Sequence, residues 1–383
     1  MPEDFLPTHG GQLRELAAKF NVPEDSLLDF SASIHPHPPS DLVVAKLCDS
    51  IRARKILTAY PDMHYAALKE AIAAYADVVV PAIAIGSGVM PLLGAAISAL
   101  RLRRCLVPVP AFAEYRKVLG VCGTECCTLT VTPDTDFSLD SAQVVAKLKT
   151  SRAQAILLAN PQSPSGRLMP AKELLRLHKV VSQLGIITIV DEAFIDYAPE
   201  ESLSRRAANL PDLIVLRSLT KFFAMPGLRV AYAIACPEMR VSMESCVPAW
   251  PVGSIAAEAA CMVLQDQPSI TAAIETNARE RCWLGEQLLS LGLRVFSGAA
   301  NYLLVKINEG RNGPELWRRL ILEHRVVIRS CANFEGLDEH YFRVTVRTRI
   351  DNLHLLGAFT AVLRSTFPEC PNIASAMDSP TWL

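Results

Sequence analysis

The feature that most constrains the fold is a series of short apolar runs between residues 81 and 235, each followed by a turn and most then by helical spacing. Alternating strands and helices are typical of an α/β domain with a doubly wound, mostly parallel sheet. In such sheets functional side chains gather at the carboxyl ends of the strands. The expected strands cover residues 81–85, 105–109, 124–131, 155–158, 186–190 and 213–216. Five residues are expected at this edge, namely Phe112, Asn160, Asp191, Ser218 and Lys221.

The chain of 383 residues is long enough for two domains. Beyond Trp250 the pattern changes to a long helical stretch over 255–291, followed by short strands and helices, which indicates a smaller α+β domain. We expect four parts in chain order. They are an N-terminal arm (1–40) that packs on the small domain, a large cofactor-binding domain (41–265), the small domain (266–366) and a tail (367–383).

Composition excludes several classes of protein. Half of the residues are apolar and the net charge is −1, which favours a globular protein and gives no basic excess for nucleic acid. The most apolar stretch, 78–102, is interrupted by prolines and glycines, so no membrane span is expected. The acidic start shows no signal peptide, and the eleven cysteines lack paired zinc spacing. We therefore expect a cytoplasmic protein with reduced thiols and no metal site.

One segment combines a single lysine with groups that bind anions. Ser218 and Thr220 flank Lys221, Gly227 permits a turn and Arg229 adds a fixed positive charge. A nucleophilic amine beside an anion site is the arrangement that a pyridoxal phosphate enzyme needs. The alternative is a surface lysine at a strand end.

A second segment could cradle a phosphate. Residues 86–89 read Gly-Ser-Gly-Val between an expected strand and an apolar helix, and this turn would present backbone N–H groups at the helix N-terminus. An ordinary strand-to-helix turn would look the same.

Three further residues suit the ring of the same cofactor. Asp191 follows the mostly apolar run 186–190 and could keep a pyridine nitrogen protonated. Asn160 could donate to the ring hydroxyl, and Phe112 could stack on the ring face. Each residue alone has a commoner explanation, as a helix cap, a turn former or a core aromatic. Their joint occurrence in this order favours the cofactor.

These motifs give the chain a resemblance to the aspartate aminotransferase superfamily of pyridoxal phosphate enzymes (class I and II) over nearly its whole length. The segments that carry it are 191–196, Asp-Glu-Ala-Phe-Ile-Asp, and 216–222, Leu-Arg-Ser-Leu-Thr-Lys-Phe. Within the superfamily the chain is similar to histidinol-phosphate aminotransferases, and most similar to the threonine O-phosphate decarboxylase family of cobalamin biosynthesis. The closer match also rests on residues 9–11, 28–32, 300–304 and 328–333.

The resemblance implies a role for each motif residue. Lys221 would bind the cofactor covalently, Asp191 would pair with the ring nitrogen, Asn160 would bind the ring oxygen and Phe112 would cover the ring face. A phosphate cup would contain Ser87, Gly88, Val89, Ser218, Thr220 and Arg229, with Tyr60 reaching in from a neighbouring subunit. A homodimer with shared active sites is therefore implied.

The resemblance also implies substrate contacts. Arg343 matches the arginine that binds the substrate carboxylate, whereas His9 and Arg329 match positions near the substrate phosphate and carboxylate. Ser33 and Asn160 would lie beside the substrate. Surface solvation is the alternative for the arginines, but their apolar strands argue against it.

The implied reaction is decarboxylation of a small O-phosphorylated amino acid, such as threonine O-phosphate or serine O-phosphate, to the amino-alcohol phosphate. A histidinol-phosphate-type aminotransferase using 2-oxoglutarate, a decarboxylase of a phosphonate amino acid and a non-catalytic binding protein are the alternatives. The same catalytic residues serve decarboxylation and transamination, so the motifs leave that choice open. The chain departs from the family pattern mildly at Gln162 and Ser163, which keeps Asn160, and at residues 89–91, where a side-chain ligand of the phosphate is lost. Ser33 and His35 stand where close relatives carry asparagine near the substrate, which favours a shifted substrate such as serine O-phosphate or a phosphonate amino acid.

Overall fold

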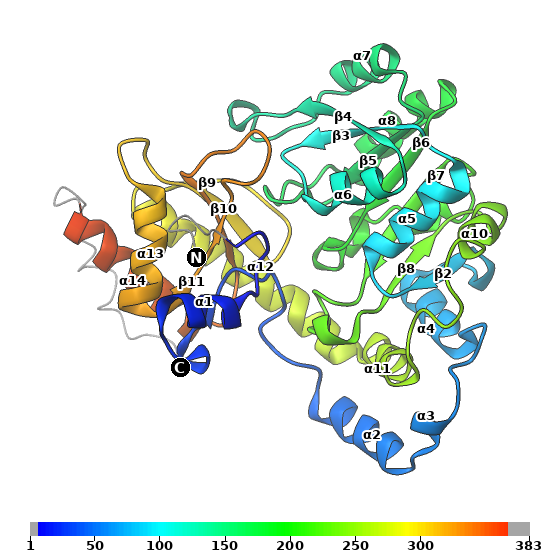
Figure 1. The fold of residues 1–383 in the computed structure, drawn as a ribbon, viewed down its shortest axis with the longest axis horizontal. Helices are drawn as coiled ribbons and strands as arrows, with labels where there is room; N and C mark the ends of the chain where they lie inside the picture. Colours follow the sequence, from blue (N-terminus) through cyan, green and yellow to red (C-terminus); the bar gives the residue numbers. More distant parts are fainter. Residues whose placement is uncertain (1–6, 367–383) are drawn as a thin grey trace.

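The computed structural model describes residues 7–366, and Figure 1 shows two bodies of unequal size. The larger, here called the large domain, is built on a seven-stranded sheet of order β2-β8-β7-β6-β5-β3-β4. The strands β4, β3, β5, β6 and β7 are parallel to one another, and β8 runs antiparallel to both of its neighbours, β2 and β7. The predicted doubly wound, mostly parallel sheet is confirmed. Its strands are β2 (Ile83–Gly86), β3 (Arg104–Val109), β4 (Glu125–Thr130), β5 (Ala155–Ala159), β6 (Ile187–Asp191), β7 (Leu213–Ser218) and β8 (Ala231–Ile234).

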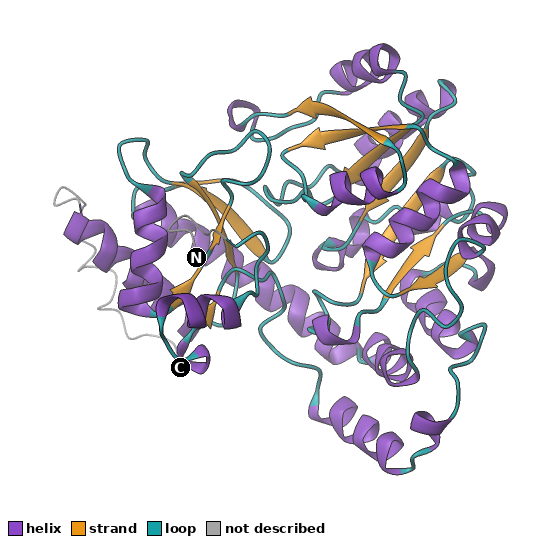
Figure 2. Cartoon of the chain, viewed as in Figure 1, coloured by secondary structure: helices purple, strands orange, loops and turns teal. Residues whose placement is uncertain are grey.

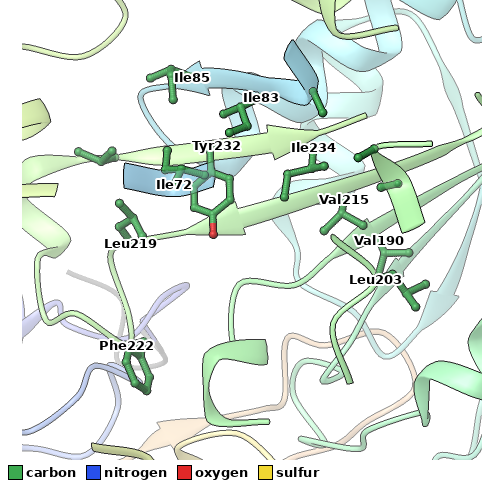
Figure 3. Packing of buried hydrophobic residues seen from close by; sticks show 14 of the residues in the cluster. Ile72, Ile83, Ile85, Val190, Leu203, Val215, Leu219, Phe222, Tyr232 and Ile234 are labelled. Atoms are coloured by element: carbon green, nitrogen blue, oxygen red, sulfur yellow. The ribbon is translucent and has the colours of Figure 1, made fainter. Parts of the chain in front are cut away.

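Helices cover both faces of this sheet (Figure 2). Side chains alternate along each strand and are apolar on both faces, so each face needs a covering layer. In β7, Leu213 and Val215 join the core on one face, whereas Ile214 and Leu216 join the core on the other. Figure 3 shows the first core around Tyr232. That face is covered by α4 (Ala66–Ala76), α7 (Ser141–Ser151), α8 (Ala171–Gln183) and α11 (Ser254–Gln265), and the other by α5 (Val89–Leu100), α6 (Glu114–Val121) and α10 (Pro237–Glu244).

Two short helices that the sequence did not predict extend from the large domain. They are α2 (Asp41–Arg52) and α3 (Lys55–Thr58), and both contact α11. A one-turn helix, α9 (Ser204–Ala207), precedes β7.

The second body, here called the small lobe, has an antiparallel sheet of order β12-β13-β10-β9. Its strands are β9 (Arg294–Val295), β10 (Tyr302–Lys306), β12 (Arg329–Ser330) and β13 (Tyr341–Thr345), and its helices are α12 (Gln267–Ser290), α13 (Gly313–His324) and α14 (Arg349–Thr366). Helix α12 joins the bodies, because Ile270 packs in the large-domain core and Leu288 in the small-lobe core.

One predicted helix is divided. The sequence predicted continuous helix over 255–291, but α11 ends at Gln265 and α12 begins at Gln267. Asp266 interrupts the helix with a side chain that accepts a hydrogen bond from Ser269 N–H, and Pro268 fits the first turn because its nitrogen carries no proton to bond.

The start of the chain packs on the small lobe. Helix α1 (Leu13–Phe20) contributes Leu16 to the small-lobe core, and β1 (Leu28–Asp29) pairs in parallel with β11 (Val326–Val327). The predicted tail, 367–383, lies outside the described residues. Within residues 7–366, no helix combines the length and apolar character required to cross a membrane.

Candidate active site

A cavity of about 440 Å³ lies at the carboxyl ends of the large-domain strands and extends to the small lobe. It is lined by residues from the arm, the large domain and β13. The predicted site residues in its lining are His9, Val89, Phe112, Asp191, Ser218, Thr220, Lys221, Arg229 and Arg343. The structure therefore brings together most of the residues that the sequence singled out.

Asp191 ends β6 as a buried carboxylate with two donors. Tyr115 Oη donates to Oδ2 at 2.6 Å, and Ala193 N–H donates to Oδ1 at 2.9 Å. Burial raises the pKa of Asp191, while these hydrogen bonds lower it and keep the carboxylate ordered. A buried carboxylate at a cavity wall can hold a cationic ring nitrogen.

Lys221 follows β7 and lines the cavity as a buried amine. Burial lowers its pKa to about 8, helped by the positive charges of Arg343 and Arg229. A substantial fraction of the amine is therefore neutral at mildly alkaline pH, as nucleophilic attack on a carbonyl requires. The backbone carbonyl of Lys221 accepts a bond from His35 N–H at 2.9 Å, which ties this loop to the arm.

The phosphate end combines a glycine turn with hydroxyls and a guanidinium. Gly88 has φ 135°, and a Cβ there would lie 3.0 Å from Arg229 Nη2, so a side chain at this position would press on the arginine. Ser218 Oγ lies 2.7 Å from Thr220 Oγ1 beside the same cavity. The turn leads into the N-terminus of α5, so its shape fits a phosphate group. Ser87 and Gly88 are in this turn, but neither is among the residues that line the cavity.

Arg343 is the cation on the opposite side. Its Nη1 lies 3.4 Å from Ser163 Oγ and its Nη2 lies 3.4 Å from Ser31 O, while buried Nε has no hydrogen-bond partner among the described residues. The guanidinium stacks over the Tyr302 ring at 4.8 Å. These bonds are long for a charged group, so the structure leaves this arginine able to bind a carboxylate.

Arg329 of β12 lies opposite Arg343 of β13 in the sheet, but its side chain makes different contacts. Its Nη1 donates to Pro7 O at 3.0 Å, and its Nη2 donates to Thr8 O and to Asn333 Oδ1, both at 2.7 Å. The side chain is not in the cavity lining. In this structure Arg329 fixes the arm, and its contact with substrate stays a prediction.

Three other predicted residues also lie outside the lining. The side chain of Asn160 exchanges two hydrogen bonds with the backbone of Met169. Ser33 has a buried hydroxyl without a partner among the described residues. Tyr60 is 80% exposed and stacks on Trp250 with ring centroids 4.6 Å apart, and it does not line the cavity of its own chain.

The sequence reasoning missed three residues that shape the cavity. Tyr115 bonds Asp191, Ser163 approaches Arg343, and Glu114 binds the ring of His9. Phe112 and Tyr115 are one helical turn apart and their rings pack edge to face at 5.8 Å. That spacing was the available signal for Tyr115.

The chain matches known proteins over most of its length. The model of the family "Aminotransferase class I and II" matches residues 25–359. The threonine-phosphate decarboxylase of Salmonella typhimurium is 34% identical over 95% of this chain and 99% of its own length. The adenosylcobalamin biosynthesis bifunctional protein of Leptospira interrogans is 28% identical over 94% of this chain and 42% of its own length.

A solved structure agrees with the sequence relatives. The histidinol-phosphate aminotransferase of Clostridium acetobutylicum superimposes with a TM-score of 0.81 and 28% identity, over 88% of this chain and all of that one. The match of the family model, the relatives and this shared fold together show that the chain belongs to the aminotransferase class I and II family.

Proposed function

We propose that this protein decarboxylates a small O-phosphorylated amino acid, threonine O-phosphate or a close analogue such as serine O-phosphate, to the amino-alcohol phosphate. The supporting observation is one cavity in which the amine of Lys221 and the carboxylate of Asp191 face an incompletely bonded arginine, Arg343, and an imidazole, His9. The likeness to the Salmonella decarboxylase over nearly the full length of both chains supports the same reaction.

The protein is an enzyme of a pyridoxal phosphate-dependent family, and its cofactor is pyridoxal 5'-phosphate. The cavity fits this group for two reasons. Gly88 leaves room beside Arg229, and the buried carboxylate of Asp191 can pair with a cationic ring nitrogen. When bound, the cofactor supplies an electron sink conjugated to the α-carbon of the substrate. We assign covalent attachment to Lys221, the ring nitrogen to Asp191 and the phosphate to Ser218, Thr220 and Arg229.

The chain's own groups then select the reaction. Arg343 orients the substrate carboxylate, and His9 takes the phosphate end. Lys221 Nζ, with a pKa of about 8, can take up or release a proton at the α-carbon near neutral pH. Arg343 and His9 would hold the two ends of the substrate, and their placement would determine which bond to the α-carbon breaks.

Transamination of the histidinol-phosphate type is the second candidate. The structural match to a histidinol-phosphate aminotransferase at 28% identity favours it, and it would use the same lysine and aspartate. A phosphonate amino acid as the decarboxylated substrate is a third.

The deciding experiment supplies threonine O-phosphate to the cofactor-loaded protein without any oxo-acid. We expect stoichiometric carbon dioxide and aminopropanol phosphate, both lost in Lys221→Ala. Absence of both products would reject this substrate. Glutamate formation that requires histidinol phosphate and 2-oxoglutarate would instead establish the aminotransferase. A parallel series with serine O-phosphate and phosphonate amino acids ranks the substrates.

We also propose a cytoplasmic homodimer in which Tyr60 completes the phosphate site of the other subunit. Tyr60 is 80% exposed, and Leu57 and Met63 beside it are each 56% exposed, which leaves an apolar surface next to the chain's own stacked Tyr60 and Trp250. All ten described cysteines are free, as is usual in a reducing compartment. The product would enter cobalamin assembly, consistent with the name of the Leptospira relative.

A further inference from the structure

Glu114 is a carboxylate in a cavity otherwise equipped to attract anions. The lining contains the cationic groups of Lys221, Arg229 and Arg343, and its other carboxylate, Asp191, already has Tyr115 as donor. A second carboxylate would weaken the binding of a phosphorylated substrate unless it had its own partner. The structure gives it one.

That partner is the imidazole of His9. His9 Nε2 lies 3.1 Å from Glu114 Oε1, and the two residues are 105 positions apart. The Glu114 side chain is 25% exposed. Its other neighbour, Lys117, is 72% exposed and lies 3.5 Å from Oε2 as an ordinary pair within one helix. The shorter and more protected bond is the one to His9.

The backbone around His9 is already fixed by the small lobe and the arm. Arg329 holds the carbonyls of the two preceding residues, Pro7 and Thr8. His9 N–H donates to Gln12 Oε1 at 3.0 Å. Gly10 lies so close to the arm that a Cβ there would be 2.1 Å from Ser31 O. The backbone therefore cannot move freely, and the remaining freedom belongs to the His9 ring.

Glu114, which belongs to the large domain, restricts rotation of the His9 ring. A bond from Nε2–H to the carboxylate fixes the ring, whose centroid lies 5.9 Å from that of Phe112. It leaves Nδ1 without a protein partner among the described residues. An imidazolium donates from both nitrogens, so a ring held by Glu114 through one can bind an anion through the other.

We infer that Glu114 is a positioning residue that acts through His9: it orients the ring for the phosphate of the substrate and so sets the affinity for phosphorylated amino acids. The inference rests on the proposed function for its choice of substrate. It adds a residue from α6 to a substrate site otherwise formed by the arm and the small lobe.

The test uses a double-mutant cycle in the cofactor-loaded full chain. Glu114→Met removes the acceptor at similar size, Glu114→Gln keeps an acceptor oxygen, and Lys117→Met removes only the other neighbour. We expect Glu114→Met to raise KM for threonine O-phosphate about three- to tenfold with kcat within about twofold. Glu114→Gln should recover most of the loss, and Lys117→Met should match wild type.

The cycle separates positioning from a general structural effect. In a His9→Phe background, Glu114→Met should add no further loss, because its effect passes through His9. An equal loss in both backgrounds, or a fall in kcat at unchanged KM, would overturn the inference.

A second measurement does not depend on turnover. In protein with ¹⁵N-labelled histidine side chains, the resonances absent from His9→Phe identify His9. Wild type and Glu114→Gln should show a protonated, hydrogen-bonded Nε2, and Glu114→Met should lose this signature. Inorganic phosphate, titrated against the same resonances, should bind about three- to tenfold more weakly to Glu114→Met.

The two results distinguish the two proposals. If threonine O-phosphate yields no carbon dioxide while the Nε2 signature still depends on Glu114 and phosphate binding weakens as expected, the substrate is wrong and the role of Glu114 stands. If the signature is the same in wild type and Glu114→Met, the positioning role is refuted whatever the enzyme turns over.

Discussion

The large-domain end of the cavity comes from residues that follow adjacent strands of one sheet, whereas the small-lobe end combines the arm with β13 of another sheet. At the first end, Asp191 has strong hydrogen bonds from Tyr115 and Ala193 before any ligand arrives. At the second, Arg343 makes only bonds of 3.4 Å, and its Nε makes none within the described chain. One end is preorganised and the other is left to be completed by a ligand.

The difference suggests a division of labour. Preorganised groups stabilise charge that develops during the reaction, so their loss should lower kcat. Incompletely bonded groups gain their bonds when the substrate binds, so their loss should raise KM. Each of the following predictions tests this assignment.

The largest effect is expected for Asp191→Asn. The amide keeps the size of the carboxylate, and its Oδ1 can still accept from Ala193 N–H. Its Nδ2 replaces the oxygen that accepts from Tyr115, and the charge that pairs with a ring nitrogen is removed. We expect kcat to fall roughly 100- to 1,000-fold with little change in KM. Steady-state kinetics measures this, and visible absorbance verifies that cofactor remains bound. Asp140→Asn, at the exposed start of α7, is the charge-matched control. A rise in KM alone would contradict the assignment.

The next effect is expected for Arg343→Met, at the other end. Loss of a charged hydrogen-bond donor should raise KM roughly 10- to 100-fold. Arg343 also lowers the pKa of Lys221, so its removal should raise that pKa from about 8. The attack of Lys221 on pyridoxal phosphate needs the neutral amine, so the pH midpoint of cofactor uptake by apoprotein should move upward.

Uptake is followed by absorbance across a pH series. Arg318→Met, on the exposed face of α13, removes a positive charge far from the cavity and should leave both KM and midpoint unchanged. An unchanged midpoint in Arg343→Met would show that Arg343 does not lower the pKa of Lys221.

The smallest effect is expected for Tyr115→Phe. This change removes one of the two donors to Asp191 but keeps the ring that packs against Phe112. We expect a three- to tenfold fall in kcat, about 1 kcal/mol. The hydrogen bond lowers the pKa of Asp191, so that pKa should rise and the acid limb of the kcat profile should move to higher pH. A profile identical to wild type would remove Tyr115 from the preorganised end. Tyr341→Phe, in a small-lobe core, is the control.

The sequence predicted best what depends on local pattern. Asp191 follows a run that is apolar except for Thr188, and Lys221 lies five residues after the apolar run 213–216. Parallel strands bring such positions to one edge. The helix break at Asp266 also had a local signal, which is a capping aspartate followed two residues later by proline. The apolar periodicity on either side of Asp266 led to the prediction of one continuous helix.

Side-chain roles that depend on contacts between residues distant in the sequence were less predictable. Arg329 and Arg343 are both arginines in short apolar strands, but only one lines the cavity, because the arm carbonyls that engage Arg329 come from 321 and 322 residues away. The role of Glu114 likewise depends on where the arm docks, which no pattern around residue 114 records.

The docking of the arm also has a consequence for how the molecule is made. Residues 7–30 are synthesised well before their small-lobe partners, which are Val326, Val327, Arg329 and Thr345. The arm therefore lacks its small-lobe partners until these later residues have been synthesised, while the large-domain sheet can already fold. Such non-local contacts form late and slowly. We therefore expect the arm to dock on the small lobe, and to place His9 at the cavity, after the lysine site of the large domain has formed.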